Sequence, residues 1–159
     1  MFNRRFLSVA LVAIAVSGCA SVPSPVSLSD SIAKNPSLST LSGLINQAGL
    51  TPTLQGHGPF TVFAPSNEAF KAVPAKTMDD LAKHPDKLKD TLSFHVVEGR
   101  LSAAEIKNSS VKTLNGAEVA LSKAGEFVTV DSAVVQTADI EASNGVIHII
   151  DSLLIPPKK

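Results

Sequence analysis

The stretch Thr61-Val-Phe-Ala-Pro-Ser-Asn-Glu-Ala-Phe70 decides the fold of this chain of 159 residues. Residues 61–64 favour a β-strand, and Pro65 ends the run because proline has no backbone N–H to donate. Ser66 suits a helix N-cap, since its hydroxyl can accept a hydrogen bond from a free backbone N–H. Glu68 then falls in the first helical turn, where the helix dipole favours a carboxylate. The stretch predicts a strand that turns directly into a short helix.

A second long motif, Asn144-Gly-Val-Ile-His-Ile-Ile-Asp-Ser-Leu-Leu-Ile-Pro156, lies near the C-terminus. The two motifs resemble the two signatures of the fasciclin (FAS1) domain family, the first of which is close to Thr-x-Phe-Ala-Pro-Ser/Thr-Asn/Asp-x-Ala-Phe. The resemblance covers residues 29–157 and implies an α+β fold, a β-wedge of two small packed sheets with several short helices along one side. It assigns a structural role to the motif residues Thr61, Phe63, Ala64, Pro65, Asn67, Phe70, His95, Asn144, Gly145, His148 and Pro156.

The first residues are typical of a secretory signal peptide. A basic pair, Arg4 and Arg5, precedes an apolar run over residues 7–16, which is shorter than the roughly 20 residues of a membrane span. The run ends in Val16-Ser-Gly-Cys19, which resembles the lipobox of bacterial lipoproteins. We therefore expect residues 1–18 to be removed as a lipoprotein signal peptide. An ordinary secretory signal without lipid is the alternative.

Cys19 is the only cysteine of the chain, and its thiol would take a diacylglyceryl group, with a further acyl chain such as palmitate on the new N-terminus. Each buried CH₂ contributes about 0.8 kcal/mol, so two or three chains anchor firmly. Residues 19–28 include Pro23 and Pro25 and are expected to form an extended tether. The sequence thus predicts an extracytoplasmic, membrane-anchored lipoprotein. In a Gram-negative host, Ala20 after the cysteine favours the outer membrane, on its periplasmic face or at the cell surface.

Composition limits the partners that the chain can bind. The 14 basic and 14 acidic residues balance, and removal of the signal peptide takes two arginines with it, which leaves a net charge near −2. That charge gives no electrostatic basis for nucleic-acid binding. The remaining 141 residues suffice for one domain with its own hydrophobic core, and they contain no tryptophan or tyrosine. We expect a single FAS1 copy, monomeric in solution, with residues 158–159 as a solvated tail.

Helical patterns fill the first half of the domain and strand patterns the second, which predicts an α+β fold. Residues 39–48 place apolar side chains at i, i+3, i+4 and i+7, with Gly49 as the C-cap. Asn115-Gly116 is a strong hairpin signal. Further helices are expected from Asp30, at 50–54, after Ser66, from Thr77, from Pro85 and at the capping box Ser102–Glu105. Strands are expected at 111–114, 117–121, 127–130, 133–137 and 146–150, with Pro156-Pro157 ending the last strand.

His95 lies between Phe94 and Val96 in what the sequence presents as an apolar strand. Burying an imidazole without a partner costs about 1–3 kcal/mol, so a hydrogen bond is expected, and the resemblance suggests Asn67 as the partner. The family carries Tyr-His at this place, and in animal relatives the region is tied to integrin binding. The missing tyrosine hydroxyl and the lack of an Arg-Gly-Asp triplet argue against an integrin partner. An interaction face that follows the relatives would include Phe94 and Val97.

The sequence has no pattern typical of catalysis or metal binding. Its histidines are scattered, without His-x-His or His-Glu-x-x-His spacing, and no Gly-x-Ser-x-Gly elbow is present. We expect His148 to be a core histidine with its hydrogen bonds satisfied, and His57 and His84 to be solvated. The chain is therefore expected to be no enzyme and to hold no metal and no cofactor.

The expected function is that of a lipid-anchored extracytoplasmic adhesion or binding module. Related domains mediate cell–cell or cell–matrix contact, so the resemblance implies a protein, a polysaccharide or an envelope component as the partner. Two alternatives stay open. Some fasciclin proteins bind pigments, so the chain could carry a small hydrophobic ligand, or it could be a periplasmic structural protein of the envelope.

Overall fold

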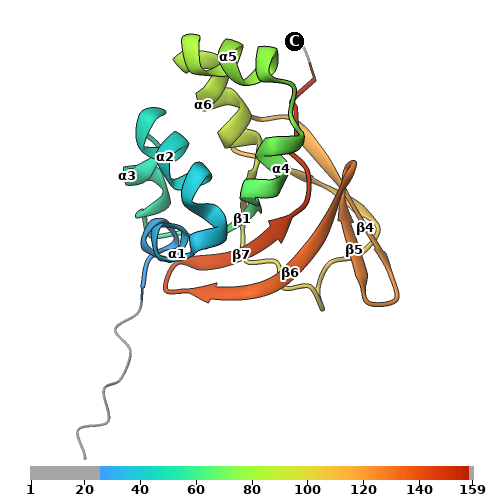
Figure 1. The fold of residues 1–159 in the computed structure, drawn as a ribbon. Helices are drawn as coiled ribbons and strands as arrows, with labels where there is room; N and C mark the ends of the chain where they lie inside the picture. Colours follow the sequence, from blue (N-terminus) through green and yellow to red (C-terminus); the bar gives the residue numbers. More distant parts are fainter. Residues whose placement is uncertain (1–25, 158–159) are drawn as a thin grey trace, which may run out of the picture.

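The computed structural model describes residues 26–157, and Figure 1 shows their fold. The predicted signal peptide, Cys19 and residues 158–159 lie outside the described residues. The helices are α1 (Leu28–Lys34), η1 (Pro36–Leu38, a 3₁₀ turn), α2 (Ser39–Gln47), α3 (Thr51–Leu54), α4 (Asn67–Ala72), α5 (Ala75–Lys83) and α6 (Pro85–Phe94). The strands are β1 (Phe60–Pro65), β2 (Val96–Glu98), β3 (Ser109–Lys112), β4 (Glu118–Ala124), β5 (Phe127–Val130), β6 (Ala133–Ala142) and β7 (Gly145–Ile150).

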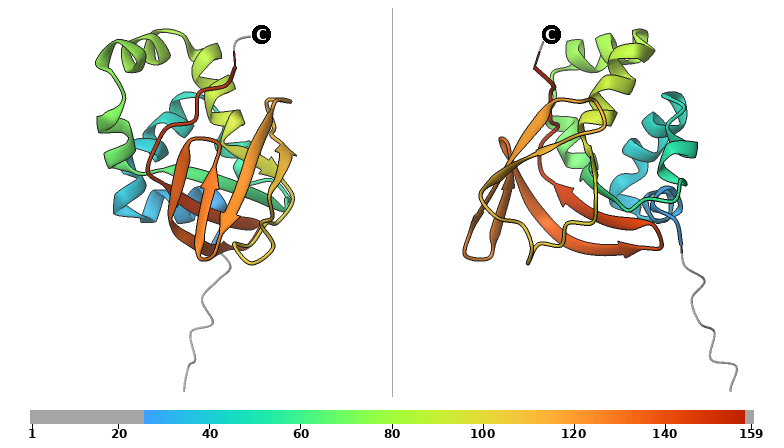
Figure 2. Two further views of the ribbon diagram at one scale, coloured as in Figure 1. Left: turned by 90° about the vertical axis from the view of Figure 1, so that its right-hand side faces the viewer. Right: turned by 180° about the vertical axis from the view of Figure 1, so that it is seen from behind.

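The seven strands follow the order β2-β1-β7-β6-β5-β4-β3. Strands β1 and β7 pair in parallel, and the other neighbours pair antiparallel. The two sheets of the predicted wedge are joined through the ten-residue strand β6, which pairs with β7 on one side and β5 on the other. A bridge between Val97 and Thr113 brings the two ends of the strand order together. Figure 2 shows the resulting bent sheet, with the helices gathered on one side. The α+β prediction is confirmed.

Strands β1 and β7 are buried on both faces because they lie between two hydrophobic clusters. Val62 and Ala64 of β1 pack with the helices, whereas Phe63 points into the interior of the bent sheet. The side chains of β7 alternate between the two clusters in the same way, and Ile147 and Ile149 lie on the helix side. Side chains of a strand alternate between its faces, so a strand buried on both sides reads as a continuous apolar run. This explains the apolar runs of both signature motifs.

Local signals in the sequence are confirmed where their hydrogen bonds stay local. Ser66 caps α4 by accepting a hydrogen bond from the Ala69 N–H at 3.3 Å. Gly49 ends α2 with a φ of +68°, and Gly116 turns the β3–β4 hairpin with a φ of +89°. Both angles lie in the left-handed region that glycine adopts without steric cost.

Two expected elements differ in the structure. The Ser102–Glu105 segment is a turn and not a helix, because both the Ser102 N–H and its hydroxyl donate to the Glu105 carboxylate, at 3.0 and 2.9 Å. The hydroxyl therefore does not accept from a helical N–H as an N-cap does. Strand β7 ends at Ile150, before Pro156, because the Val134 N–H of β6 donates to the side-chain carboxylate of Asp151 at 2.9 Å and not to a backbone carbonyl of a continuing strand.

Two helix starts also fall earlier than expected. Helix α1 begins at Leu28, within the predicted tether, with Ser27 as its N-cap and Leu28 fully buried. Helix α5 begins at Ala75 instead of Thr77, after Pro74. Within the described residues, no helix is both long enough and apolar enough to cross a membrane.

Candidate functional site

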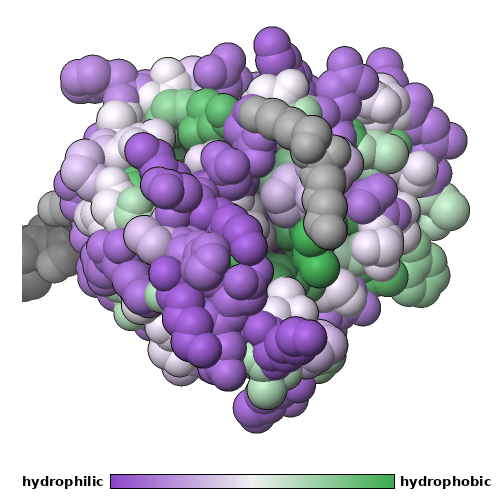
Figure 3. Space-filling view, turned by 90° about the horizontal axis from the view of Figure 1, so that it is seen from above, coloured by the Kyte–Doolittle hydropathy of each residue, from purple (hydrophilic) through white to green (hydrophobic). Residues whose placement is uncertain are grey.

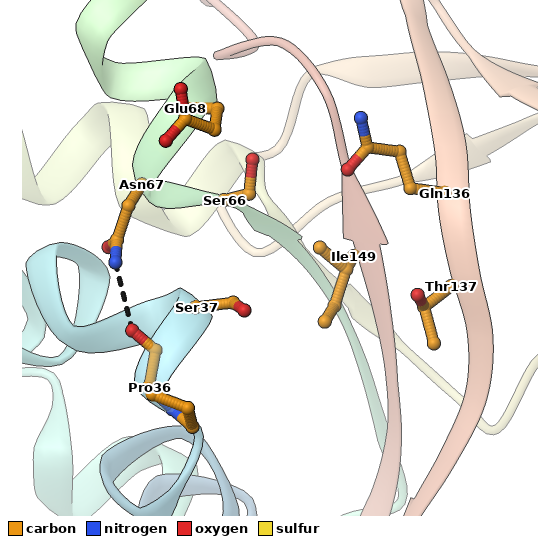
Figure 4. Close-up of a pocket in the computed structure, with 8 residues that line it drawn as sticks. All are labelled: Pro36, Ser37, Ser66, Asn67, Glu68, Gln136, Thr137 and Ile149. Carbon is orange, nitrogen blue, oxygen red and sulfur yellow. Dashed lines mark hydrogen bonds between the residues drawn. The ribbon is translucent and has the colours of Figure 1, made fainter.

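A polar groove lies where the first signature motif turns from β1 into α4 (Figure 4). It has a volume of about 330 Å³ and is open to solvent on one side. Figure 4 shows η1 forming one wall and β6 the other, with Ile149 of β7 between them and the start of α4 at the end. The lining residues are Pro36, Ser37, Ser66, Asn67, Glu68, Gln136, Thr137 and Ile149.

Asn67 holds the η1 wall of the polar groove in place. Its side-chain N–H donates to the Pro36 carbonyl at 2.9 Å, and its oxygen accepts from the Thr40 N–H at 3.1 Å and the Ser39 hydroxyl at 3.3 Å. All these partners lie in η1 or at the start of α2. The prediction that Asn67 bonds to His95 is therefore wrong, because the amide group is fully used in joining α4 to the N-terminal helices.

The β6 wall results from an interruption in strand pairing. The register between β6 and β7 shifts between Val135 and Thr137, so Gln136 is an extra residue opposite β7. Such a β-bulge bends a strand and redirects its side chains. Gln136 and Thr137 are both exposed there, and both line the groove.

A second shift in β6, between Thr137 and Ile140, has a clear structural cause. Asp139 adopts a φ of +56°, and its backbone N–H donates to Nδ1 of His148 at 3.3 Å. The Asp139 carboxylate accepts from the Ala103 N–H at 2.8 Å. The irregular part of β6 thus holds the loop that follows β2 against the sheet.

His148 is a buried histidine with both ring nitrogens bonded, as the sequence predicts. Nε2 donates to the Leu101 carbonyl at 2.7 Å, which leaves Nδ1 as the acceptor for the Asp139 N–H. The ring stacks on Phe63 with centroids 5.6 Å apart. Burial lowers the pKa of His148, and the Leu101 carbonyl opposes that shift only in part. The neutral form is therefore favoured.

His95 is the C-cap of α6 and does not lie in a strand. Its Nε2 accepts from the Leu154 N–H at 3.0 Å, so the proton must be on Nδ1, which donates to the Thr91 carbonyl at 2.7 Å. Burial lowers the pKa of His95 from 6.5 to about 4, although the bond to Thr91 acts in the opposite direction. The ring fastens the chain after β7 to the end of α6.

The interaction face predicted at Phe94 and Val97 is not available in this fold. Phe94 is 2% exposed and Val97 is 1% exposed, and both side chains belong to the cluster inside the bent sheet. Val97 is covered because β2 is enclosed by β1 on one side and the bridge to Thr113 on the other. A partner cannot touch these side chains without opening the core.

The remaining motif residues hold the ends of β1 and β7. The Thr61 hydroxyl donates to the Gly99 carbonyl at 2.7 Å and accepts from the Leu101 N–H at 2.9 Å. Asn144 accepts from the Leu28 N–H at 2.9 Å and donates to the carbonyls of Leu54 and Gly56 at 2.7 and 2.8 Å. Ala64, Pro65 and Phe70 are buried, Gly145 begins β7, and Pro156 is half-buried after the strand.

The polar groove offers hydrogen bonds and no catalytic arrangement. Its Ser66 hydroxyl accepts from a backbone N–H, and its carboxylate, Glu68, pairs with Lys71 at 2.6 Å. The two buried histidines have used their ring nitrogens elsewhere, and the exposed His57 and His84 do not line it. Among the described residues, no cluster of three or more His, Cys, Asp or Glu side chains could hold a metal ion.

Sequence reasoning missed Ser37, Gln136 and Thr137 as groove residues. Ser37 lies in a 3₁₀ turn between two helices, and Gln136 and Thr137 are placed by the bulge. No spacing pattern in the sequence connects the three, because the walls come from segments about 100 residues apart. The polar character of residues 136 and 137 within an apolar strand was the one available signal.

Comparison with known proteins identifies relatives across the whole domain. A family model described as "Fasciclin domain" matches residues 36–156. Protein sll1483 of Synechocystis sp. is 40% identical over 145 residues, which cover 90% of this chain and 81% of the relative. The cell surface glycolipoprotein MPB83 of Mycobacterium bovis is 37% identical over 128 residues, which cover 77% of this chain and 57% of the relative.

Other relatives contain the domain as a smaller part. The transforming growth factor-beta-induced protein ig-h3 of Sus scrofa is 37% identical over 119 residues, covering 74% of this chain but 17% of that protein. A solved FAS1 domain pair from the insect cell adhesion molecule Fasciclin I superposes with a TM-score of 0.66 at 17% identity. That match covers 82% of this chain and 51% of the solved chain, and it supports the fold alone.

Proposed function

The chain is a member of the fasciclin domain family, and on that premise we propose that it is a lipid-anchored, extracytoplasmic adhesion module. The lipid on Cys19 would hold it at a membrane, and the folded domain would offer a binding surface to a partner. One of its relatives is described as a cell surface glycolipoprotein. The function is one of binding, without a catalysed reaction.

The observation that carries this proposal is the polar groove. Its hydroxyl and amide side chains come from three separate elements, and Glu68 is its one charged residue. Small numbers of well-placed polar groups give a binding site its orientation and specificity. Uncharged hydrogen-bonding groups match a partner rich in hydroxyl or amide groups, such as a polysaccharide or an exposed peptide segment.

The groove does not favour the alternative function as a carrier of a hydrophobic ligand. A site that binds a hydrophobic ligand is lined predominantly by apolar side chains. Ile149 and Pro36 are the apolar members of this lining, and Ile149 is 7% exposed.

The binding role of the groove is tested by the double variant Gln136→Ala/Thr137→Ala. We expect attachment of cells that display the full chain to fall about tenfold or more, because two hydrogen bonds of about 1 kcal/mol each are lost. Attachment is measured by counting retained cells on a matrix to which the unmodified protein binds. Both side chains are exposed, so the melting temperature should change little.

The matched control is Thr53→Ala/Gln55→Ala, which removes the same two residue types from exposed positions at α3. This variant should attach as the unmodified protein does. Equal attachment by both double variants would exclude the groove as the binding surface.

The location of the domain is tested by protease treatment of intact cells, with Cys19→Ala as the control for the anchor. We expect the unmodified domain to be digested from outside and the variant to leave the membrane fraction. Protection of the anchored domain until the envelope is opened would overturn the surface location and favour the alternative of a periplasmic structural protein.

A further inference from the structure

Phe127 is the most exposed large hydrophobic side chain among the described residues, at 72%. It begins β5, directly after the Gly125-Glu126 loop that connects β4 to β5. Val128 and Val130 of the same strand are buried, so Phe127 lies on the outer face of the sheet. Most of the Phe127 ring is therefore left in contact with water by the fold of this chain.

The hairpin tip lies on the same side of the molecule as the start of the described chain. In Figure 1 and in both views of Figure 2, the turn between β4 and β5 and the beginning of α1 lie at the lower side. The C-terminal end lies at the upper side in all three views. Any anchor that precedes Val26 therefore pulls the domain toward a surface from the side that carries Phe127.

We propose that Phe127 is a second membrane contact, which enters the headgroup and acyl boundary of the bilayer to which Cys19 is anchored. This inference rests on the proposed lipid anchor. Seven residue steps separate Cys19 from Val26, and each spans at most about 3.6 Å, so the domain stays within roughly 25 Å of its lipid. Within that distance, the side of the domain that carries the hairpin tip can face the bilayer.

The charges near the hairpin tip favour a zwitterionic surface. Glu126 is exposed next to Phe127, and the Lys123 ammonium group donates to the Ala103 carbonyl at 2.7 Å. With a net charge near −2 after loss of the signal peptide, the chain has no overall excess of positive charge to attract anionic lipid. The contact would therefore depend on apolar burial of the ring. The face opposite the tip, seen from above in Figure 3, is mostly hydrophilic and suits exposure to water.

Two features of the sequence make the contact measurable. The chain has no tryptophan or tyrosine, so Phe127→Trp introduces a single fluorophore, and Cys19 is the only thiol. The chain from Cys19 to Lys159 is coupled through that thiol to a maleimide lipid in phosphatidylcholine vesicles that contain doxyl-labelled acyl chains. We expect the emission of the introduced indole to shift to the blue and to fall about twofold relative to vesicles without the doxyl label.

The matched control is Ile155→Trp, which replaces another exposed hydrophobic residue, 63% exposed, in the C-terminal segment on the far side. Its emission should not change with the doxyl label. If the doxyl label changed the emission of the two variants by the same amount on vesicles that carry the protein, the proposal would be overturned. A blue shift of Phe127→Trp in solution that grows with protein concentration would assign the ring to a contact between copies of the chain, and would also overturn it.

The natural lipid anchor is tested separately by the mass of the protein isolated from membranes. Chemical coupling supplies the anchor in the vesicle experiment, so absence of a natural lipid would refute the proposed anchoring without altering the quenching result. Quenching that fails on coupled vesicles would refute the role of Phe127 alone.

Discussion

Replacement of Gly145 by alanine is expected to destabilise the domain severely. Gly145 is the first residue of β7 and pairs with Phe60 at the start of β1. A Cβ atom at this position would overlap the Phe60 carbonyl oxygen and lie 2.9 Å from its carbonyl carbon, and Cδ1 of Leu28 is 3.0 Å away. The obstacle is mainly backbone, so no side-chain rotation relieves it.

The cost of Gly145→Ala should exceed the roughly 1–3 kcal/mol that is typical of an overfilled core, because strands β1 and β7 must separate where they begin to pair. That loss is a large part of the roughly 5–15 kcal/mol that stabilises a domain of this size. Circular dichroism and a thermal melt of the purified domain measure the effect. A cooperative transition within a few degrees of the unmodified protein would contradict the prediction.

Gly43→Ala is the matched control for this substitution. Gly43 lies in the exposed middle of α2, and a Cβ atom there would meet nothing within 4 Å. Alanine in a helix interior is more favourable than glycine by about 0.5–1 kcal/mol, so this variant should melt at a slightly higher temperature. The contrast separates the steric effect at Gly145 from a general effect of adding a methyl group.

The parts of the fold that sequence reasoning predicted are those determined by neighbouring residues. The Ser66 cap, the end of α2 at Gly49 and the Asn115-Gly116 hairpin each depend on contacts within a few positions. The capping box at Ser102 shows the limit of this approach. The Glu105 carboxylate accepts from the Ser102 N–H as in a capping box, but the Ser102 hydroxyl donates to the same carboxylate, and the Asp139–Ala103 contact holds the segment as a turn beside β6.

The residues whose roles were predicted wrongly depend on long-range contacts. The acceptor nitrogen of His95 receives the Leu154 N–H from 59 positions away, a partner that no local pattern indicates. Phe94 and Val97 were expected to face a partner because relatives use that region. The closing bridge to Thr113 buries Val97 here, and only the completed strand order reveals it. The bulge at Gln136 is likewise visible only in the pairing of β6 with β7.

The stability of the domain is expected to fall by about 2 kcal/mol between pH 7 and pH 5 because of His95 alone. Burial lowers the pKa of His95 from 6.5 to about 4 in the folded state. Above pH 6.5 the imidazole is neutral in both states, and its contribution to stability is complete. As the pH falls below 6.5, the unfolded chain binds a proton that the folded chain does not, so the free energy of unfolding decreases until the pH reaches the folded pKa.

The geometry explains why the folded domain resists this proton. Nε2 of His95 is occupied by the Leu154 N–H, so a proton there would place two donors against each other. The lowered pKa of His148 also makes the free energy of unfolding decrease as the pH falls, and it adds to the effect of His95. The pKa values of Asp80 and Glu105 are lowered by hydrogen bonds from Lys87 and Ser102, and their contributions are lost only at more acidic pH.

Chemical denaturation at pH 7, 6 and 5 measures this dependence, and His95→Gln isolates the contribution of the ring. The variant should be less stable at pH 7, because it loses the bond to Thr91 or to Leu154, yet its stability should decline less toward pH 5. His57→Gln, which removes an exposed imidazole, is the control and should keep the decline of the unmodified protein.

If His95→Gln does not fold, nuclear magnetic resonance of the unmodified domain still tests whether the folded His95 ring takes up a proton between pH 7 and pH 5. The His95 ring signals should keep their chemical shifts from pH 7 to pH 5, whereas titration with a midpoint near 6.5 would show that the ring is accessible to protons. In that case the contact between His95 and Leu154 would open readily, and the segment after β7 would not be fastened by it.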